Sequence, residues 1–150
     1  MEMAPYLLFN GTCEAAFKFY EKVLGGKILM MLTHGETPAK AQTPADWLSK
    51  IIHARMTFGN NVIMASDAPP GHYSKPQGFS VNISVSDPKE AERIFHALAE
   101  NGVAHMPIAE TFWAVRFGMC VDQFGTPWMV NCEKLPTGKP SEDCPSHSKV

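Results

Sequence analysis

The chain has 150 residues, of which 45% are hydrophobic and 19% charged, with a net charge of −2 and an isoelectric point near 6.3. This composition predicts one globular domain with a sizeable core, and the lack of a basic stripe argues against nucleic-acid binding. No apolar run approaches the roughly 18 residues of a membrane-spanning helix. The N-terminal residues also lack the basic region and long apolar run of a signal peptide, so we expect a cytoplasmic protein.

The cysteines do not predict disulfide bonds or a zinc site, and the C-terminal residues predict a tail outside the folded domain. The four cysteines lack C-x-x-C spacing, so we expect free thiols rather than a zinc site or disulfides; they are Cys13, Cys120, Cys132 and Cys144. Residues 136–150 are rich in proline, serine and charge, and they predict a flexible polar tail after a domain spanning residues 1–135.

The first half of the chain predicts one strand, one helix and three further strands. An apolar run at 4–10 is followed by helical spacing of apolar residues between Ala16 and Val23, and Gly25 and Gly26 end that helix. Strand candidates follow at 27–34, 51–59 and 61–67. A polar loop at 35–49 separates the first two of these strands.

The second half repeats this order. A strand at 78–86 precedes a helix that begins with Asp87 as N-cap and Pro88 in the first helical position. Strands are then predicted at 103–109, 113–122 and 126–132. The repetition indicates an α+β fold of two tandem βαβββ modules, at about 4–67 and 78–133. We expect an eight-stranded curved cup, with the helices outside and a pocket that belongs to neither half alone.

Residues 4–133 resemble the vicinal-oxygen-chelate superfamily, which includes glyoxalase I, bleomycin-resistance proteins and extradiol dioxygenases. The similar segments are PYLLFNGTCEAAFKFY, FYEKVLGGKIL, MASDAPPG, ETFWAVRFG and DQFGTPWMVN, and they match the PhnB-like branch more narrowly. Some members of that branch are described as demethylubiquinone methyltransferases. This sequence has no G-x-G loop of the kind that holds S-adenosylmethionine.

The resemblance also implies where a divalent metal would be bound, with two ligands from each module. Those positions fall on Pro5, Met64, Ser80 and Met129. Without a carboxylate or imidazole among them, these residues do not suit the metals that such enzymes use, so we expect no metal and no other cofactor. A Met–Met pair suits Cu(I), but methionine in a cup is more often packing.

The same register selects the side chains that line the cup. Alternation in the strand at 78–86 directs Ser80, Asn82 and Ser84 inward and its valines and isoleucine toward the helix. The strand at 61–67 contributes Val62, Met64 and Ser66; the first strand contributes Pro5, Leu7 and Phe9, and the last contributes Pro127, Met129 and Asn131. Such apolar walls with a few hydroxyl and amide groups fit a small organic ligand. Trp128 falls on the helix-facing side, so we expect it in the core.

Five further residues are candidates for binding or catalysis. His53 and Arg55 share a face of one strand with Thr57; if that face is inward, Arg55 is able to bind an anionic group and His53 to act as a base. Glu110 is a candidate base at the rim, and Arg116 either pairs with it or reaches a ligand. Trp113 fits stacking on a flat ligand or packing under a partner subunit.

Three functions remain compatible with these residues. A metal-free cup that binds a small molecule is favoured, and whether the protein is an enzyme stays open. The alternatives are a metal-dependent lyase, isomerase or dioxygenase with His53, Asp67 and Glu110 as substitute ligands, or a metal-independent acid–base enzyme using Glu110 or His53. We also expect a homodimer, because curved sheets expose edges that need covering and members of the superfamily commonly pair.

Overall fold

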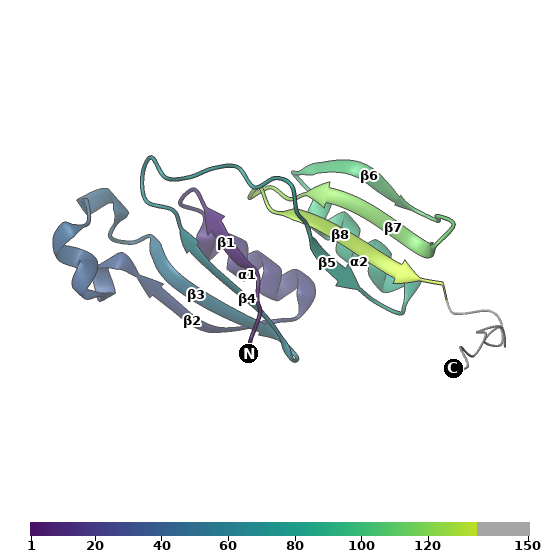
Figure 1. The fold of residues 1–150 in the computed structure, drawn as a ribbon, viewed down its shortest axis with the longest axis horizontal. Coiled ribbons are helices and arrows are strands. Elements are labelled where there is room, and N and C mark those ends of the chain that lie inside the picture. Colours follow the sequence, from purple (N-terminus) through teal and green to yellow (C-terminus); the bar gives the residue numbers. More distant parts are fainter. Residues whose placement is uncertain (135–150) are drawn as a thin grey trace, which may run out of the picture.

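A computed structural model describes residues 1–134 of the chain, and the predicted tail at 136–150 lies outside this range. The predicted order of strands and helices is confirmed, with β-α-β-β-β occurring twice (Figure 1). The elements are β1 (Tyr6–Phe9), α1 (Cys13–Leu24), β2 (Lys27–Thr33), β3 (Ile51–Phe58), β4 (Asn61–Asp67), β5 (Val81–Ser84), α2 (Pro88–Ala99), β6 (Val103–Ala109), β7 (Ala114–Val121) and β8 (Pro127–Glu133). The polar loop between β2 and β3 contains three short 3₁₀ turns.

The eight strands form two hydrogen-bonded sheets of four, ordered β1-β4-β3-β2 and β5-β8-β7-β6. In each sheet the first strand pairs in parallel with the last, and the other pairs are antiparallel. This identical topology confirms the duplication and the α+β class predicted from the sequence.

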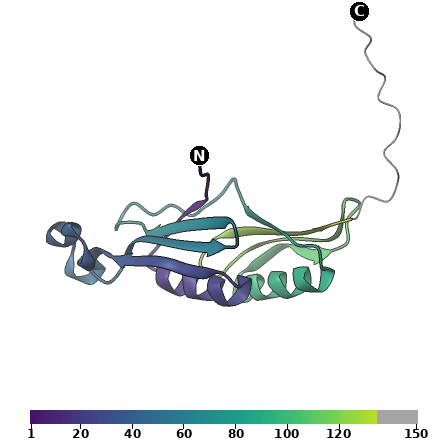
Figure 2. The same ribbon diagram turned by 90° about the horizontal axis from the view of Figure 1, so that it is seen from below.

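Both helices lie along one side of the molecule, and the strands lie above them (Figure 2). The buried core therefore sits between helices and sheets, where Tyr20 and Phe17 of α1 and Leu98 of α2 are fully enclosed. Trp128 is 1% exposed, which confirms its predicted place in the core. Cys13, Cys120 and Cys132 are free thiols, as predicted, and all three are buried; Cys144 lies outside the described residues. None of the helices in residues 1–134 is long and apolar enough to cross a membrane.

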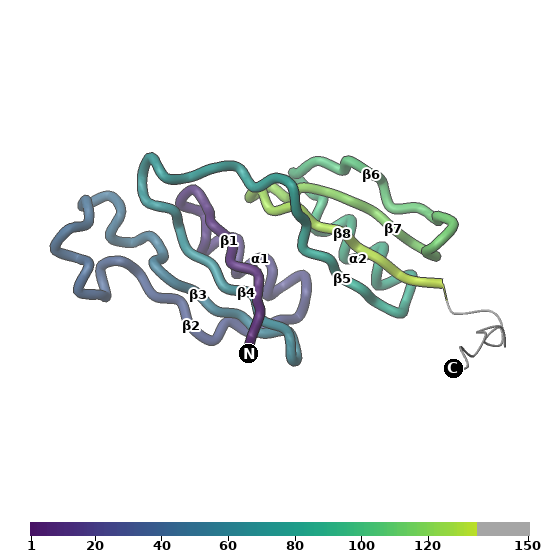
Figure 3. The backbone as a smooth tube through the Cα atoms, in the orientation of Figure 1, coloured from purple at the N-terminus to yellow at the C-terminus, as the bar shows by residue number. Residues whose placement is uncertain are grey.

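The two modules are joined by the segment at 68–80, which crosses from the end of β4 to the start of β5 (Figure 3). The helices also meet directly, because Arg93 Nη2 of α2 donates a 2.9 Å hydrogen bond to the carbonyl oxygen of Val23 in α1. These links hold β5 and α2 beside the β3–β4 hairpin.

The N-terminus of α1 is capped from another strand. Thr12 makes no side-chain capping bond, but the carboxylate of Asp67 at the end of β4 accepts a 2.9 Å bond from the backbone N–H of Cys13. Its other oxygen accepts a 2.8 Å bond from the N–H of Ile51. A buried carboxylate at a helix N-terminus satisfies orphan donors and complements the helix dipole. At the other end, Gly25 adopts the left-handed conformation that closes the helix.

Each sheet has one face that packs on a helix and one that we call its open face. The open face of the first sheet is defined by Tyr6, Leu8, Met30, Leu32, His53, Arg55, Thr57, Val62, Met64 and Ser66. The open face of the second sheet is defined by Asn82, Ser84, Met106, Phe117, Met119, Met129 and Asn131.

The prediction for the first strand was wrong by one residue. Leu7 and Phe9 are 4% and 1% exposed and pack in the helix-facing core, whereas Tyr6 and Leu8 are on the open face. Tyr6 pairs with Met64 in the parallel ladder and shares its face. The position opposite Met64 therefore belongs to Tyr6 and not to Pro5.

Candidate functional site

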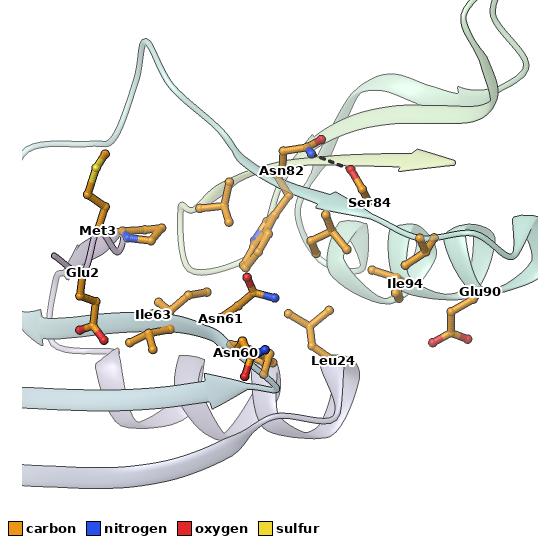
Figure 4. Close-up of a pocket in the computed structure, with 17 residues that line it drawn as sticks. Glu2, Met3, Leu24, Asn60, Asn61, Ile63, Asn82, Ser84, Glu90 and Ile94 are labelled. Atoms are coloured by element: carbon orange, nitrogen blue, oxygen red, sulfur yellow. Dashed lines mark hydrogen bonds between the residues drawn. The ribbon is translucent and has the colours of Figure 1, made fainter. Parts of the chain in front are cut away.

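A pocket of about 610 Å³ lies where the two modules meet (Figure 4). One wall comes from β5 and α2 of the second module, and the other comes from the N-terminal residues and the β3–β4 hairpin of the first. Its lining residues are mainly apolar, with a few amides and two carboxylates. A junction between modules is a common place for a small-molecule site.

Polar groups approach this pocket from both modules. Asn60 lies in the β3–β4 turn and Asn61 begins β4. Asn82 and Ser84 project from β5 on the opposite side (Figure 4). Asn82 Nδ2 donates a 3.0 Å hydrogen bond to Ser84 Oγ, which fixes the direction of the amide. Together these groups offer both donors and acceptors to a ligand held between apolar walls.

The apolar walls are provided by the strands and both helices. Leu24 ends α1 and Ile94 lies on α2, and the two approach the pocket from its helix side (Figure 4). The indole of Trp128 closes the back, and its Nε1 donates a 2.8 Å bond to Asp122 Oδ2. This hydrogen bond satisfies the indole N–H of a side chain that is 1% exposed.

Asp122 stands at the centre of a buried network that supports this wall. Its carboxylate also accepts from the Tyr20 hydroxyl at 2.5 Å and from the backbone N–H groups of Phe124 and Thr126 at 2.8 and 3.0 Å. Burial, and then the Asp122 charge, raise the pKa of Tyr20 well above its ordinary value. The phenol therefore stays protonated and donates its hydrogen bond.

His53, Arg55 and Ser66 lie on the open face of the first sheet and not on the face that packs on a helix. Tyr6 Oη lies 3.1 Å from His53 Nδ1, and the two rings are stacked at 5.7 Å between centroids. Arg55 Nη2 bonds to both carboxylate oxygens of Glu2 at 2.9 Å, and its Nη1 lies 3.7 Å from the Met64 sulfur. Glu2 is the member of this group that also lines the pocket.

The open face of the second sheet carries Asn82, Met129 and Asn131, as predicted from the alternation. Asn131 Oδ1 is buried without a hydrogen-bond partner among the described residues. Of the ligand-binding candidates on both sheets, only Asn82 lines the pocket. Ser80 lies just before β5, outside the pocket lining.

Trp113 and Glu110 lie in and beside the turn between β6 and β7. The Trp113 ring packs edge-on against Phe117 at 5.3 Å, which brings it to the second open face. Glu110 bonds to Lys134 at 3.0 Å, and that bond is the main cause of the lowered pKa of its carboxyl. A lowered pKa weakens a carboxylate as a general base at neutral pH.

Arg116 points toward the helix side rather than the open face. It pairs with Cys132, and its Nε donates a 2.9 Å hydrogen bond to Glu92 on α2. The alternative in which Arg116 pairs with Glu110 is not what the structure shows, because Glu110 bonds to Lys134 instead. Arg116 shares the helix-facing side of β7 with Cys120, whose ladder partner Trp128 is in the core.

The donors at the expected metal positions do not fit a hard or borderline divalent ion. They are two thioethers, one neutral hydroxyl and, with the corrected register, the phenol of Tyr6. The substitute ligands His53, Asp67 and Glu110 do not converge either. Asp67 is buried on the helix side of the first sheet, where its carboxylate accepts from two backbone N–H groups. His53 lies on the open face of that sheet, and Glu110 belongs to the second module. Within residues 1–134, no three His, Cys, Asp or Glu side chains converge as metal ligands would.

Two βαβββ modules with helices on one side define the fold of the vicinal-oxygen-chelate superfamily. A glyoxylase/bleomycin resistance protein/dioxygenase domain from Frankia sp. EAN1pec shares it, with a TM-score of 0.63, 13% identity, and coverage of 89% of this chain and 98% of that one. Within this fold, residues 1–131 match the family described as 3-demethylubiquinone-9 3-methyltransferase. The chain belongs to that PhnB-like family.

Other proteins match the chain over most of its length. Protein PA1353 from Pseudomonas aeruginosa has 48% identity and a TM-score of 0.82, with coverage of 89% of this chain and 98% of that one. Protein YjdN from Escherichia coli strain K12 is 37% identical over 142 residues, covering 89% of this chain and 97% of YjdN. A putative 3-demethylubiquinone-9 3-methyltransferase, PhnB protein, from Bacillus cereus has the same fold, with a TM-score of 0.72, 20% identity, and coverage of 88% and 99%.

Sequence reasoning missed most of the pocket lining. Asn60 and Asn61 have the composition of an ordinary hairpin turn, and Leu24 and Ile94 that of helix core. Nothing local in the sequence indicates that this turn faces β5 across the junction. Asn82 and Ser84 carried a usable signal through the strict alternation of their strand. Pro5 and Val62, which were also expected to line the cup, line this pocket as well.

Proposed function

We propose that this protein binds a small organic ligand in the pocket at the junction of its modules, without a metal ion. The observation that carries this proposal is the pairing of apolar walls from both modules with the amides of Asn60, Asn61 and Asn82. Such a surface favours a ligand of modest size with an apolar body and hydrogen-bonding groups. The name of the family suggests methyl transfer, but the sequence has no G-x-G loop to hold S-adenosylmethionine.

The donor chemistry described above supports the metal-free form of this proposal over the metal-dependent alternative. An acid–base enzyme receives less support, because Glu110 is an exposed side chain bonded to Lys134, and this bond lowers the pKa of its carboxyl. His53 is bonded to Tyr6 outside the pocket lining. We therefore favour a binding protein, and we treat turnover as a separate question.

Thermal shift screening against a library of small metabolites tests the proposal. We expect the wild-type protein to gain thermal stability with a ligand that also protects pocket residues in NMR spectra. Val62→Phe fills the pocket and should weaken that ligand at least about tenfold, which is about 1.4 kcal/mol. Leu32→Phe, on the same open face but outside the pocket, is the matched control and should bind normally. Ligand binding that is unaffected by Val62→Phe would contradict this location.

Metal analysis of the purified protein tests the second half of the proposal. We expect no stoichiometric divalent ion, and ligand binding that is unchanged after treatment with a chelator. A bound ion at one per chain, together with an activity that chelation abolishes, would favour the metal-dependent alternative instead.

We further propose that the protein is a homodimer in which a second copy covers the open faces. Tyr6, Leu8 and Met30 on the first sheet are 45%, 46% and 40% exposed, and Met106 on the second is 42% exposed. Tyr6 and Leu8 lie on β1 and Met30 lies on β2, which are the two opposite edge strands of the first sheet. A second copy laid over the open face would bury these exposed apolar side chains and cover the sheet edges.

Sedimentation velocity tests the dimer. Leu8→Glu should produce a monomer, because it places a charge within the apolar face. Phe79→Glu, at a side chain of similar exposure in the segment before β5, should leave the dimer intact. A monomeric wild-type protein would contradict the proposal.

A further inference from the structure

Among the described residues, the one charged partner of Arg55 is Glu2, which belongs to a segment without regular structure. Glu2 lies before β1, and its neighbours Met1 and Met3 are 117% and 88% exposed, so little packing holds this segment. Its carboxylate nevertheless reaches Arg55 Nη2 with both oxygens at 2.9 Å. The exposed fractions of the two side chains, 30% for Arg55 and 53% for Glu2, show that solvent reaches the pair.

Glu2 also forms part of the pocket wall, together with Met3 and Pro5 (Figure 4). The carboxylate on Arg55 therefore lies at the boundary of the pocket, opposite Asn82 and Ser84 (Figure 4). The pocket lining contains two acidic side chains and no basic one. Each carboxylate is bonded to an arginine outside the lining, Glu2 to Arg55 and Glu90 to Arg93, and of these two pairs only Glu2–Arg55 is held by a segment without regular structure. Displacement of Glu2 would free Arg55 Nη2, which lies 2.9 Å from the oxygens of a carboxylate that lines the pocket.

The guanidinium retains donors for a larger anion. Glu2 uses Nη2 alone, and Nη1 has only the weak thioether acceptor of Met64 at 3.7 Å. A planar guanidinium is able to hold a carboxylate or phosphonate through two parallel hydrogen bonds, which is stronger than one shared donor. An anion that reached both nitrogens would form a better pair than Glu2 does.

We infer that Arg55 is the anion-recognition residue of the pocket, and that Glu2 occupies its place until a ligand carboxylate or phosphonate displaces it. This inference rests on the proposed function and narrows the ligand class to small organic oxyanions. The apolar walls would hold the organic body, and the amides of Asn61 and Asn82 would bind its remaining polar groups.

Two probes of nearly the same shape isolate the effect of the ligand's negative charge on binding. Benzoate and benzamide have nearly the same shape, and phenylphosphonate tests the second oxyanion. Their dissociation constants are measured on the full chain by NMR titration, following the Arg55 Nε–H signal and the amides of Asn82 and Ile83. In wild-type protein, benzoate should move the Arg55 signal and benzamide should not.

Variants separate Arg55 and Glu2. Glu2→Gln removes the competing charge and should tighten benzoate about two- to fivefold, as for an exposed ion pair, with benzamide unchanged. Glu14→Gln is the matched control: Glu14 is also 53% exposed and ion-paired, but it lies on α1 outside the pocket, so the same charge change should have no effect. Arg55→Gln should abolish the preference for benzoate, and Arg55→Lys should retain part of it without the two-nitrogen geometry.

The outcomes distinguish this inference from the proposed function. The role of Arg55 would be overturned if the ratio of the benzoate and benzamide dissociation constants were the same in wild type, Glu2→Gln and Arg55→Gln. If benzamide still moved the signals of Asn82 and Ile83, the pocket itself would stand. If neither benzoate nor phenylphosphonate moved any pocket signal in folded Glu2→Gln protein, the oxyanion class would be overturned as well.

Discussion

Tyr20 and Asp122 lie 102 positions apart in the chain, and the Tyr20 hydroxyl donates a 2.5 Å hydrogen bond to the Asp122 carboxylate. Tyr20 belongs to α1 of the first module, and Asp122 follows β7 in the second. The same carboxylate holds the indole of Trp128, which closes the pocket. This pair therefore connects the two modules directly behind the proposed binding site.

Replacing Tyr20 by phenylalanine should destabilise the fold by about 1–3 kcal/mol, because a buried carboxylate loses one of its donors while the ring is kept. Thr126 Oγ1, which lies 2.9 Å from the same hydroxyl, also loses a partner. Urea denaturation followed by circular dichroism measures this change.

Tyr6→Phe is the matched control, since it removes a hydroxyl whose partner His53 is partly exposed. We expect a cost below about 0.5 kcal/mol there. Equal effects of the two substitutions would show that the link between the modules adds nothing to stability.

Asp67 gives a second prediction about buried acceptors. Asp67→Asn keeps the shape but leaves one oxygen for two buried N–H donors, those of Cys13 and Ile51. We expect a loss of about 2–3 kcal/mol in the free energy of unfolding, because one donor then faces the amide NH₂ group.

The same substitution at Asp87 provides the comparison. Asp87 is an exposed N-cap that accepts from the N–H of Lys89, and asparagine caps helices as well as aspartate does. Asp87→Asn should therefore change stability by less than about 0.5 kcal/mol. A comparable loss at both positions would contradict the special role of Asp67 at the start of α1.

Most of the secondary structure could be predicted because its signals are local. Helical spacing identified α1 and α2, and the alternation of Val81, Asn82, Ile83 and Ser84 gave the correct faces of β5. β1 gave no such signal, since all four residues of Tyr6–Phe9 are large and apolar. Its facing was decided by packing against α1, which the sequence of the strand does not reveal.

The site was harder to predict because it depends on contacts between modules. Arg116, a candidate for binding, bonds instead to Glu92 on α2, a partner 24 positions away that the pattern of its own strand does not reveal. The importance of Glu2 arises only where the N-terminal segment meets Arg55, 53 positions further along the chain. Such long-range pairing leaves no periodic pattern in the sequence.

Buried thiol and phenol groups make the free energy of unfolding depend on pH in the alkaline range. Burial, followed by the charge of Asp122, raises the pKa of Cys120 to about 11, and burial is also the main cause of the raised pKa values of Cys13 and Tyr20. Below the unfolded thiol pKa of about 8.5, these groups are protonated in both states and add no pH dependence. Above it the unfolded chain ionises first, so the free energy of unfolding falls as the pH rises.

Urea unfolding at pH 7.5 and pH 9.5 checks this dependence. Cys120→Ala removes one of the titrating groups and should reduce the loss of stability between the two pH values by about 1 kcal/mol. Labelling with iodoacetamide at pH 8 should also be slow for Cys13 and Cys120 in the folded protein and fast in urea. Rapid labelling of either thiol in the folded state would contradict its burial.

Variants of Arg116 test whether this side chain has a structural role or a role in binding. Its Nε bonds to Glu92 at 2.9 Å, and both side chains are about one-third exposed, with exposed fractions of 35% and 37%. Arg116→Ala should therefore cost no more than about 1 kcal/mol of stability, as partly exposed ion pairs usually do. Because the side chain faces α2 and lies outside the pocket, the affinity for a pocket ligand should stay within about twofold of wild type. Glu92→Gln provides the partner measurement, and a loss of affinity in Arg116→Ala but not in Glu92→Gln would return Arg116 to the binding site.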